Sequence, residues 1–374
     1  MSWRMLKQPP FAAIITALPH LVPFTGPEAM GRARGRPFKA RLGANESSFG
    51  ASPRAVSIMR EAASENWMYS DPENFALRSA IAAFHSVAIE NIMVGEGIDG
   101  LLGLTCMLFL GAGDSVVTTD GAYPTFNFHV LAHGGRLIAL PMRDFREDLM
   151  GLSDTARRQR AKLIYVSNPN SPMGSWWPGS DLDAWIRDLP DQTMLVLDEA
   201  YCDTAPAGTT PPVDVSNTQV IRYRTFSKAY GLAGARIGYA IAHPTVIEAF
   251  DKVRNHYGIN RVGQLGAAAA LADQSYLAEA VRRIARARDR ISTIVSDHGL
   301  AARPSGASFV AVDCRRDGAF AKRVLDGLLA RDVFVRKPVA PQLDHFIRVS
   351  CGRDDHLDIF AAALGGAVDD ADAN

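Results

Sequence analysis

The chain has 374 residues, enough for more than one domain, and its 40 basic and 40 acidic side chains give a formal net charge of zero. This balance argues against a strongly basic surface, and hence against nucleic acid as a partner. The four cysteines, Cys106, Cys202, Cys314 and Cys351, include no C-x-x-C pair. A zinc knuckle and a disulfide framework are therefore disfavoured, and we expect a reduced, cytoplasmic protein.

Residues 11–18 form an apolar stretch behind Arg4 and Lys7 that imitates a secretory signal. Pro19 and Pro23 interrupt the pattern, and the stretch is shorter than the roughly 20 apolar residues that span a bilayer. We expect an N-terminal arm that packs on another domain or subunit, with a signal peptide as the alternative, and no membrane partner.

A loop rich in Gly, Asn and Ser follows at residues 42–53 and contains Asn45. Ser52 is predicted to cap the next helix, with Pro53 at its first position, because the serine oxygen accepts a free N–H group and proline lacks one. A second helical pattern covers residues 75–84.

A short apolar strand at residues 92–94 leads into a helix that is expected to reach about residue 110. Gly95, Glu96 and Gly97 occupy the corner between them. The first backbone N–H groups of a helix bind phosphate well, because the helix dipole adds to their hydrogen bonds. The corner is therefore a candidate phosphate site, although glycines there serve equally well as a simple turn.

From residue 114 onward, short apolar runs alternate with helix-length segments such as residues 181–189. Strands that are buried on both faces and joined by crossovers predict a mostly parallel sheet covered by helices. Ligands of such sheets bind at the carboxyl ends of the strands. The runs are residues 116–118, 137–140, 163–166, 194–197, 220–226 and 237–241.

Polar residues follow two of these runs. Asn168 comes after residues 163–166, in a proline-containing loop, and its side chain can donate a hydrogen bond. Asp198 and Tyr201 come after residues 194–197. A carboxylate beneath a pyridine nitrogen keeps that nitrogen protonated, which makes the ring an electron sink. The alternative for Asp198 is a helix N-cap.

A lysine stands at the end of the next run. The amine of Lys228 can form an imine with an aldehyde cofactor and can also move protons. Thr225 and Ser227 supply hydroxyl groups beside it, and Arg236 supplies a guanidinium suited to phosphate. Together they predict a site for a phosphorylated aldehyde; the alternative is a lysine-tipped surface turn.

The last third of the chain begins with a long charged helix that is predicted to end near His298. Arg348 lies on a predicted strand and suits a carboxylate, since a guanidinium pairs with it through two parallel hydrogen bonds. An edge charge against aggregation is the alternative. Arg336 and Asn45 are further substrate-binding candidates. Strands are predicted at residues 309–312, 333–335 and 346–350, helices at 245–255, 320–330 and 357–364, and a frayed polar tail at 368–374.

His129 and His133 have the i, i+4 spacing of a metal pair. No acidic residue accompanies them as H-E-x-x-H requires, so we assign no metal.

From about residue 42 to residue 352, these motifs resemble the fold-type I pyridoxal-phosphate aminotransferases, most closely the histidinol-phosphate aminotransferase-like branch. The resemblance implies pyridoxal 5′-phosphate on Lys228, Asp198 at the ring nitrogen and Tyr201 and Asn168 at the ring hydroxyl. Tyr123, in preference to Phe126, would stack on the ring, and Tyr69 would reach a partner's cofactor phosphate across a homodimer. Ser171 and Met173 stand where Asn and Thr are usual.

The fold implied is α/β, with a large domain built on a mostly parallel seven-stranded sheet and a smaller α/β domain near the C-terminus. We expect an N-terminal arm at residues 1–50 that joins the small domain, a large cofactor-binding domain at 51–262 and a small domain at 263–374.

The leading hypothesis is a ping-pong aminotransferase acting on an L-amino acid, histidinol-phosphate-like or aromatic, and a 2-oxo acid. A decarboxylase or lyase of similar appearance, such as a threonine-phosphate decarboxylase, is the second hypothesis, since the same electron sink serves any bond at Cα. A silent effector-binding protein is the third; the presence of both Lys228 and Arg348 argues against it.

Overall fold

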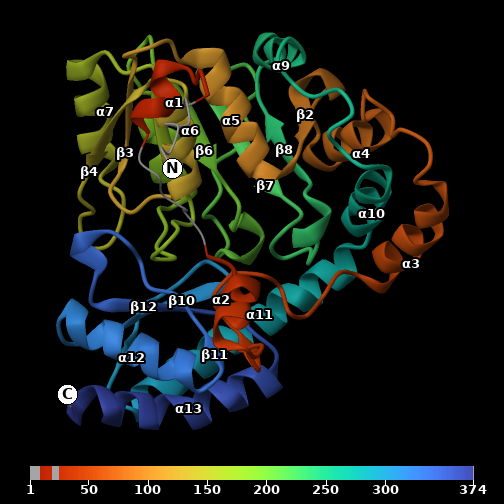
Figure 1. Cartoon of the computed structure of the whole chain (residues 1–374). Coiled ribbons are helices and arrows are strands. Elements are labelled where there is room, and N and C mark those ends of the chain that lie inside the picture. Colours follow the sequence, from red (N-terminus) through yellow and green to blue (C-terminus); the bar gives the residue numbers. More distant parts are fainter. Residues whose placement is uncertain (1–8, 19–24, 374) are drawn as a thin grey trace, which may run out of the picture.

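The computed structural model describes residues 9–18 and 25–373 (Figure 1). Arg4, Lys7, Pro19 and Pro23 of the predicted arm lie outside the described residues. The molecule has two parts of different size. The larger is a sheet with helices on both faces, and the smaller, next to it, contains a small sheet formed by the last third of the chain (Figure 1).

The large sheet has seven strands, with β8 antiparallel to both neighbours and the remaining pairs parallel. This confirms the predicted α/β class with a mostly parallel sheet. In sheet order the strands are β2 (Ile92–Gly95), β8 (Gly238–Ile241), β7 (Val220–Thr225), β6 (Met194–Asp198), β5 (Leu163–Ser167), β3 (Ser115–Thr119) and β4 (Arg136–Leu140).

Alternate residues of these strands pack on opposite faces, as a strand's period of two requires. Tyr165 joins the apolar cluster under α5, α6 and α9, whereas Ile164 and Val166 join the one under α7 and α8. Helices α3, α4 and α10 pack beside β2 and β8. The bounds are α3 (Pro53–Ala62), α4 (Phe75–His85), α5 (Gly97–Phe109), α6 (Pro124–Ala132), α7 (Leu149–Gln159), α8 (Gly179–Ile186), α9 (Pro244–Asp251) and α10 (Arg261–Ala272).

The smaller part contains a three-stranded sheet, β12-β10-β9, and a two-stranded parallel pair, β1 with β11. Its apolar cluster is formed by the small sheet and the long helices at the C-terminal end of the chain. The bounds are β1 (Ala40–Arg41), β9 (Ala301–Ala302), β10 (Phe309–Asp313), β11 (Val333–Phe334), β12 (Phe346–Ser350), α2 (Pro27–Arg34), α11 (Gln274–Asp297), α12 (Gly318–Ala330) and α13 (Asp354–Ala373). Helix α1 (Ala13–Ala17) lies beside α6 on the large part instead (Figure 1).

Most predicted elements are confirmed, down to the Ser52 cap, whose Oγ accepts the Ala55 N–H at 3.1 Å. Two predictions about helix ends were wrong. Helix α9 ends at Asp251, four residues early, and the tail at 368–374 is not frayed, because α13 continues to Ala373. Packing explains the second: Ala371 is 1% exposed. On the polar side of the same turn, Asp370 pairs with Arg331.

The boundary proposed after residue 262 falls inside α10, which packs on α3. Ala267 and Leu277 belong to the cluster beside β2 and β8, whereas Ile284 belongs to that of the small sheet. This packing favours a later boundary, within α11, and the division itself stays a prediction. No helix among the described residues is long and apolar enough to cross a bilayer.

Candidate active site

A cavity of about 400 Å³ opens at the carboxyl ends of β3, β5, β6 and β7. Ten residues singled out in the sequence line it: Asn45, Tyr123, Asp198, Tyr201, Thr225, Ser227, Lys228, Arg236, Arg336 and Arg348. Five others, Tyr69, Gly95, Glu96, Gly97 and Asn168, do not.

Asp198 ends β6 and is 6% exposed at the floor of the cavity. Its carboxylate accepts hydrogen bonds from the Tyr165 hydroxyl at 2.7 Å and the Ala200 N–H at 2.9 Å. Burial raises the pKa of this carboxyl, while the two donors and the charge of Lys228 oppose the rise. No helix follows directly, so Asp198 is not a helix N-cap.

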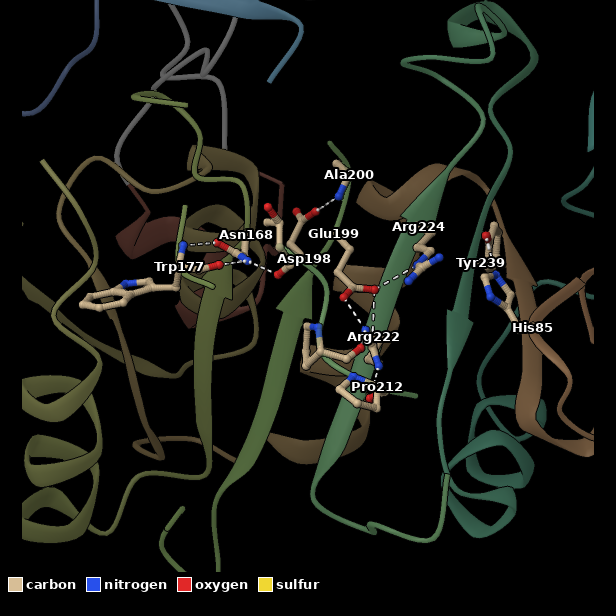
Figure 2. A network of polar contacts seen from close by, with 12 residues as sticks. His85, Asn168, Trp177, Asp198, Glu199, Ala200, Pro212, Arg222, Arg224 and Tyr239 are labelled. Carbon is tan, nitrogen blue, oxygen red and sulfur yellow. Dashed lines mark hydrogen bonds and ion pairs between the residues drawn. The ribbon is translucent and has the colours of Figure 1, made fainter. Parts of the chain in front are cut away.

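The residue after Asp198 turns away from the cavity and anchors the strand end. Glu199 pairs with Arg222 at 2.6 Å and with Arg224 at 2.9 Å, both on the adjacent strand β7 (Figure 2). Burial alone would raise the pKa of Glu199, but the two guanidinium groups outweigh it and hold that pKa below its usual range. This buried network, which the sequence reasoning missed, fixes the chain direction that turns Asp198 into the cavity.

Lys228 comes three residues after the end of β7 and lines the cavity. The amine lies 3.4 Å from the Asn45 carbonyl oxygen and 5.5 Å from the centre of the Tyr201 ring. Tyr201 is 5% exposed and packs edge-on against Phe309. The amine is therefore inside the cavity and not on a surface turn.

Asn45 links three parts of the chain. It sits in the left-handed region at φ 55° and donates from Nδ2 to the Tyr201 hydroxyl oxygen at 2.8 Å. Its Oδ1 accepts from the Ser350 hydroxyl at 2.9 Å, and its own N–H donates to the same hydroxyl oxygen at 3.0 Å. Its side chain is thus committed to positioning Tyr201, a role that the sequence did not reveal.

Hydroxyl groups and a guanidinium gather at one end of the cavity. Thr225 and Ser227 are buried there, and the Ser227 N–H donates to Thr225 Oγ1 at 3.0 Å. A Cβ placed on Gly97 would lie 2.5 Å from Nη2 of Arg236, and Gly97 itself has φ 73°. Glycine is therefore required at the start of α5 so that the Arg236 guanidinium can cover it.

The corner before α5 meets the sequence expectation only in part. Ile98 and Asp99, in the first turn of α5, line the cavity. Glu96, in contrast, is exposed and points its carboxylate toward Asn255, whose Nδ2 lies 3.4 Å away. Gly95 packs against Leu101, as a Cβ placed on it would lie 2.5 Å from that side chain.

Asn168 does not reach the cavity. Its Nδ2 donates to the carbonyl oxygens of Trp177 and Thr209 at 3.1 and 3.0 Å, and its Oδ1 accepts the Trp177 N–H at 2.8 Å. All of these bonds hold loop backbone in place (Figure 2 shows the two with Trp177). Ser171, three residues on, lines the cavity instead. Both N–H groups of the amide are already used, so the structure gives the predicted contact of Asn168 with a ring hydroxyl no support.

Tyr123 stands before α6 with its ring at the cavity, and burial raises the pKa of its hydroxyl to about 12. Its competitor Phe126 is fully buried and stacks on Tyr165 with ring centres 4.5 Å apart. Of these two residues, Tyr123 is the one placed to stack on a ligand.

Arg348, on β12, lines the same cavity as Lys228. Its Nε is buried and has no hydrogen-bond partner among the described residues, while Nη2 lies 3.5 Å from the Gly43 carbonyl oxygen. Burial lowers the pKa of this guanidinium to about 10, so it stays charged at neutral pH. Arg336 lies beside it through a backbone bridge and donates from Nη2 to the Thr25 carbonyl oxygen at 3.1 Å.

Tyr69 lies away from the cavity, with 82% of its surface exposed, and packs against Tyr257 with ring centres 4.8 Å apart. His129 lies 3.6 Å from Asp99. Within residues 9–18 and 25–373, no group of three or more His, Cys, Asp or Glu side chains is placed to hold a metal ion.

The donor set fits a flat phosphorylated aldehyde. Hydroxyl groups and Arg236 suit the phosphate, the buried Asp198 suits a ring nitrogen, and the Lys228 amine suits the aldehyde carbon. Tyr123 supplies an aromatic wall between them.

Residues 39–364 match the family model of aminotransferase class I and II. The crystal structure of histidinol-phosphate aminotransferase from Sinorhizobium meliloti in complex with pyridoxal-5′-phosphate is 48% identical, with a TM-score of 0.94, and the match covers 96% of this chain and 98% of that one. A histidinol-phosphate aminotransferase from Moorella thermoacetica is 33% identical over 94% of this chain and 91% of its own length. L-threonine-O-3-phosphate decarboxylase from Porphyromonas gingivalis matches 87% of this chain and 98% of its own with a TM-score of 0.74; at 19% identity this shows the shared fold alone.

Proposed function

The chain belongs to the class I and II aminotransferases and uses pyridoxal 5′-phosphate, and on that premise we propose that its amino donor is an amine with an anionic group, histidinol phosphate in the first place. The acceptor is a 2-oxo acid. The observation that carries the proposal is the buried Arg348 Nε, which has no partner among the described residues and faces the same cavity as Lys228.

Different residues of the cavity would bind different groups of the cofactor. Ser227, Thr225, Arg236 and the first turn of α5 would hold the phosphate, and Asp198 would pair with the ring nitrogen. When bound, the cofactor supplies the electron sink that stabilises negative charge at the amino-bearing carbon. Tyr123 would cover one face of the ring.

Lys228 is the proton carrier in this scheme. With the cofactor bound, the amine of Lys228 would accept and move the proton that leaves the amino-bearing carbon of the substrate. The Asn45 carbonyl oxygen and the Tyr201 ring flank Nζ and limit the directions in which it can turn.

Tyr201 and Ser171, in place of Asn168, would donate hydrogen bonds to the hydroxyl oxygen of the cofactor ring. The Tyr201 hydroxyl oxygen accepts from Asn45, which leaves its proton free to donate to the cofactor oxygen. Ser171 offers a second hydroxyl at the cavity wall.

Arg348 binds the anion that both substrates carry: the phosphate of histidinol phosphate in one half-reaction and the α-carboxylate of an amino acid in the other. Arg336 adds a second positive charge at the same end of the cavity. Aromatic amino acids carry one carboxylate each and are the alternative amino donors.

A homodimer and a cytoplasmic location complete the proposal. Tyr69 and Tyr257 are 82% and 53% exposed, large apolar surface for a second copy of the chain to cover, and Tyr69 would reach the cofactor phosphate of that copy. The cysteines are all free, which fits a reducing compartment.

Titration of the cofactor-loaded protein with histidinol phosphate, glutamate and aromatic amino acids, followed by absorbance, tests the donor. We expect the band near 420 nm that internal imines of this cofactor show to fall, as one near 330 nm grows, at the lowest concentration for histidinol phosphate. Turnover of an aromatic amino acid but not of histidinol phosphate would refute the donor and leave the family untouched. Carbon dioxide release without consumption of oxo acid would indicate a decarboxylase instead.

A further inference from the structure

A second cavity of about 580 Å³ lies beside the catalytic one, where residues 143–148 and 173–177 meet residues 303 and 304. We propose that this cavity, here called the Arg146–Arg303 cavity, binds a small oxyanion such as a phosphate or carboxylate group. It shares no lining residue with the catalytic cavity, and the proposal does not depend on which amino donor the enzyme uses.

Two guanidinium groups in the Arg146–Arg303 cavity have no acidic partner among the residues that the structure describes. Arg303 lies over the Phe145 ring at 4.5 Å and Arg146 over the Trp177 ring at 5.6 Å. Within the described chain, neither makes an ion pair or a side-chain hydrogen bond, whereas the third arginine, Arg143, pairs with Asp148 at 2.7 Å. A guanidinium held by its face against an aromatic ring keeps its N–H edge free for an oxyanion.

The loop that carries Arg146 is held in an unusual conformation. Asp144 and Phe145 are consecutive non-glycine residues with φ of 48° and 60°. Arg143 and Arg146 close the turn through two backbone hydrogen bonds of 2.8 and 2.9 Å, and Ser175 Oγ donates to the Phe145 carbonyl oxygen at 2.7 Å. Such local strain persists only where surrounding contacts enforce it, and it concentrates at ligand sites.

The charge of the cavity favours an anion. Three arginines and three acids line it, but Asp148 is paired with Arg143, and Glu147 is 2% exposed and hydrogen-bonded to the chain behind it, which leaves one acid, Asp144, for Arg146 and Arg303. The guanidinium groups of Arg146 and Arg303 can therefore each donate a charge-assisted hydrogen bond to one oxyanion.

The position gives an occupant a mechanical link to the active site. Glu147 Oε1 accepts from the Ser167 N–H at 3.1 Å and from Asn170 Nδ2 at 3.0 Å, and Ser167 lines the catalytic cavity. Arg146 belongs to the large part of the chain, whereas Arg303 precedes β10 of the small sheet, next to the Gly306 N–H bond to the Gly174 carbonyl oxygen at 2.8 Å. An anion held by both arginines would fasten the two parts together.

Calorimetric titration of the cofactor-loaded enzyme with inorganic phosphate and, separately, citrate tests the proposal and separates phosphate from carboxylate ligands. We expect saturable binding of at least one, weakened about tenfold by each of Arg146→Gln and Arg303→Gln. Arg187→Gln, which removes one exposed charge directly after α8, is the matched control and should bind as the parent does.

The cofactor absorbance band of each variant reports folding independently of the titration. Binding that persists unchanged in the Arg146→Gln, Arg303→Gln double variant but disappears in Arg348→Gln would place the anion in the catalytic cavity and overturn the proposal. Absence of binding by both anions to the parent enzyme would overturn it as well.

Discussion

The amide of Asn45 donates a 2.8 Å hydrogen bond to the hydroxyl oxygen of Tyr201, joining residues 156 positions apart in the sequence. Through Ser350 the same asparagine is tied to β12. One side chain thus connects the segment before α3, the large sheet and the small sheet at the point where the catalytic amine lies.

Asn45→Asp reverses the direction of this hydrogen bond. A carboxylate cannot donate, so the Tyr201 hydroxyl would donate to it and lose the proton that we assign to the cofactor oxygen. We expect about a tenfold lower kcat and a shifted visible band, and Tyr201→Phe should do the same. The double variant should be no worse than either single one; additive losses in that cycle would show that the two residues act separately.

Lys228→Ala should remove the proton carrier and the imine-forming amine together. The visible band near 420 nm should vanish, and kcat should fall by at least about 10³-fold, within the range that positioned acid–base groups contribute. Lys337→Ala is the matched control, since Lys337 lines the same cavity. If the visible band were retained in Lys228→Ala, or lost in Lys337→Ala, the assignment of the imine-forming amine to Lys228 would be wrong.

The sequence was sufficient to predict elements whose signal is local. Short segments of sequence are enough to recognise the buried strands, the Ser52 cap and the lysine that follows a strand. These features appear in the structure as expected. The side-chain direction of Asn168 depended on carbonyl groups of Trp177 and Thr209, up to 41 positions away. The tail of α13 likewise depended on packing against α12. Contacts of that range leave no periodic trace in the chain.

Arg348→Gln should separate substrate binding from chemistry. The loss of a bidentate, partly buried guanidinium is expected to raise KM roughly 100-fold for the anionic donor with a much smaller change in kcat. Because burial lowers the pKa of Arg348 to about 10, KM of the parent enzyme should stay level from pH 7 to 9 and rise as the pH approaches 10. Equal KM values for the variant and the parent would remove Arg348 from the substrate site.

Glu147→Gln should change how stability depends on pH. Burial raises the pKa of Glu147 from 4.5 to about 8, so the folded state holds a proton that the unfolded chain has already released. The contribution of Glu147 to the free energy of unfolding is fully present below pH 4.5 and is lost as the pH rises through 8. The variant should therefore gain stability relative to the parent between these values, by an amount on the order of a few kcal/mol.

Denaturant unfolding of the parent and Glu147→Gln at pH 5, 7 and 9 measures this difference. Glu61→Gln, a change to an exposed carboxyl on α3, serves as the comparison and should give parallel curves. A difference between Glu147→Gln and the parent that does not change with pH would mean that the carboxyl is already ionised in the folded protein.

Asn168→Ala and Ser171→Ala distinguish a structural amide from a cofactor contact. Asn168 is 3% exposed and holds the backbone of Trp177 and Thr209, so its removal should lower the free energy of unfolding by about 1–3 kcal/mol, with two carbonyl groups left without their donor. The visible band of the bound cofactor should hardly move. Ser171 lines the cavity, so Ser171→Ala should leave unfolding nearly unchanged while it shifts that band and weakens cofactor retention. Unfolding in denaturant and absorbance spectra of the two variants would decide, and the reverse pattern would restore Asn168 to the cofactor site.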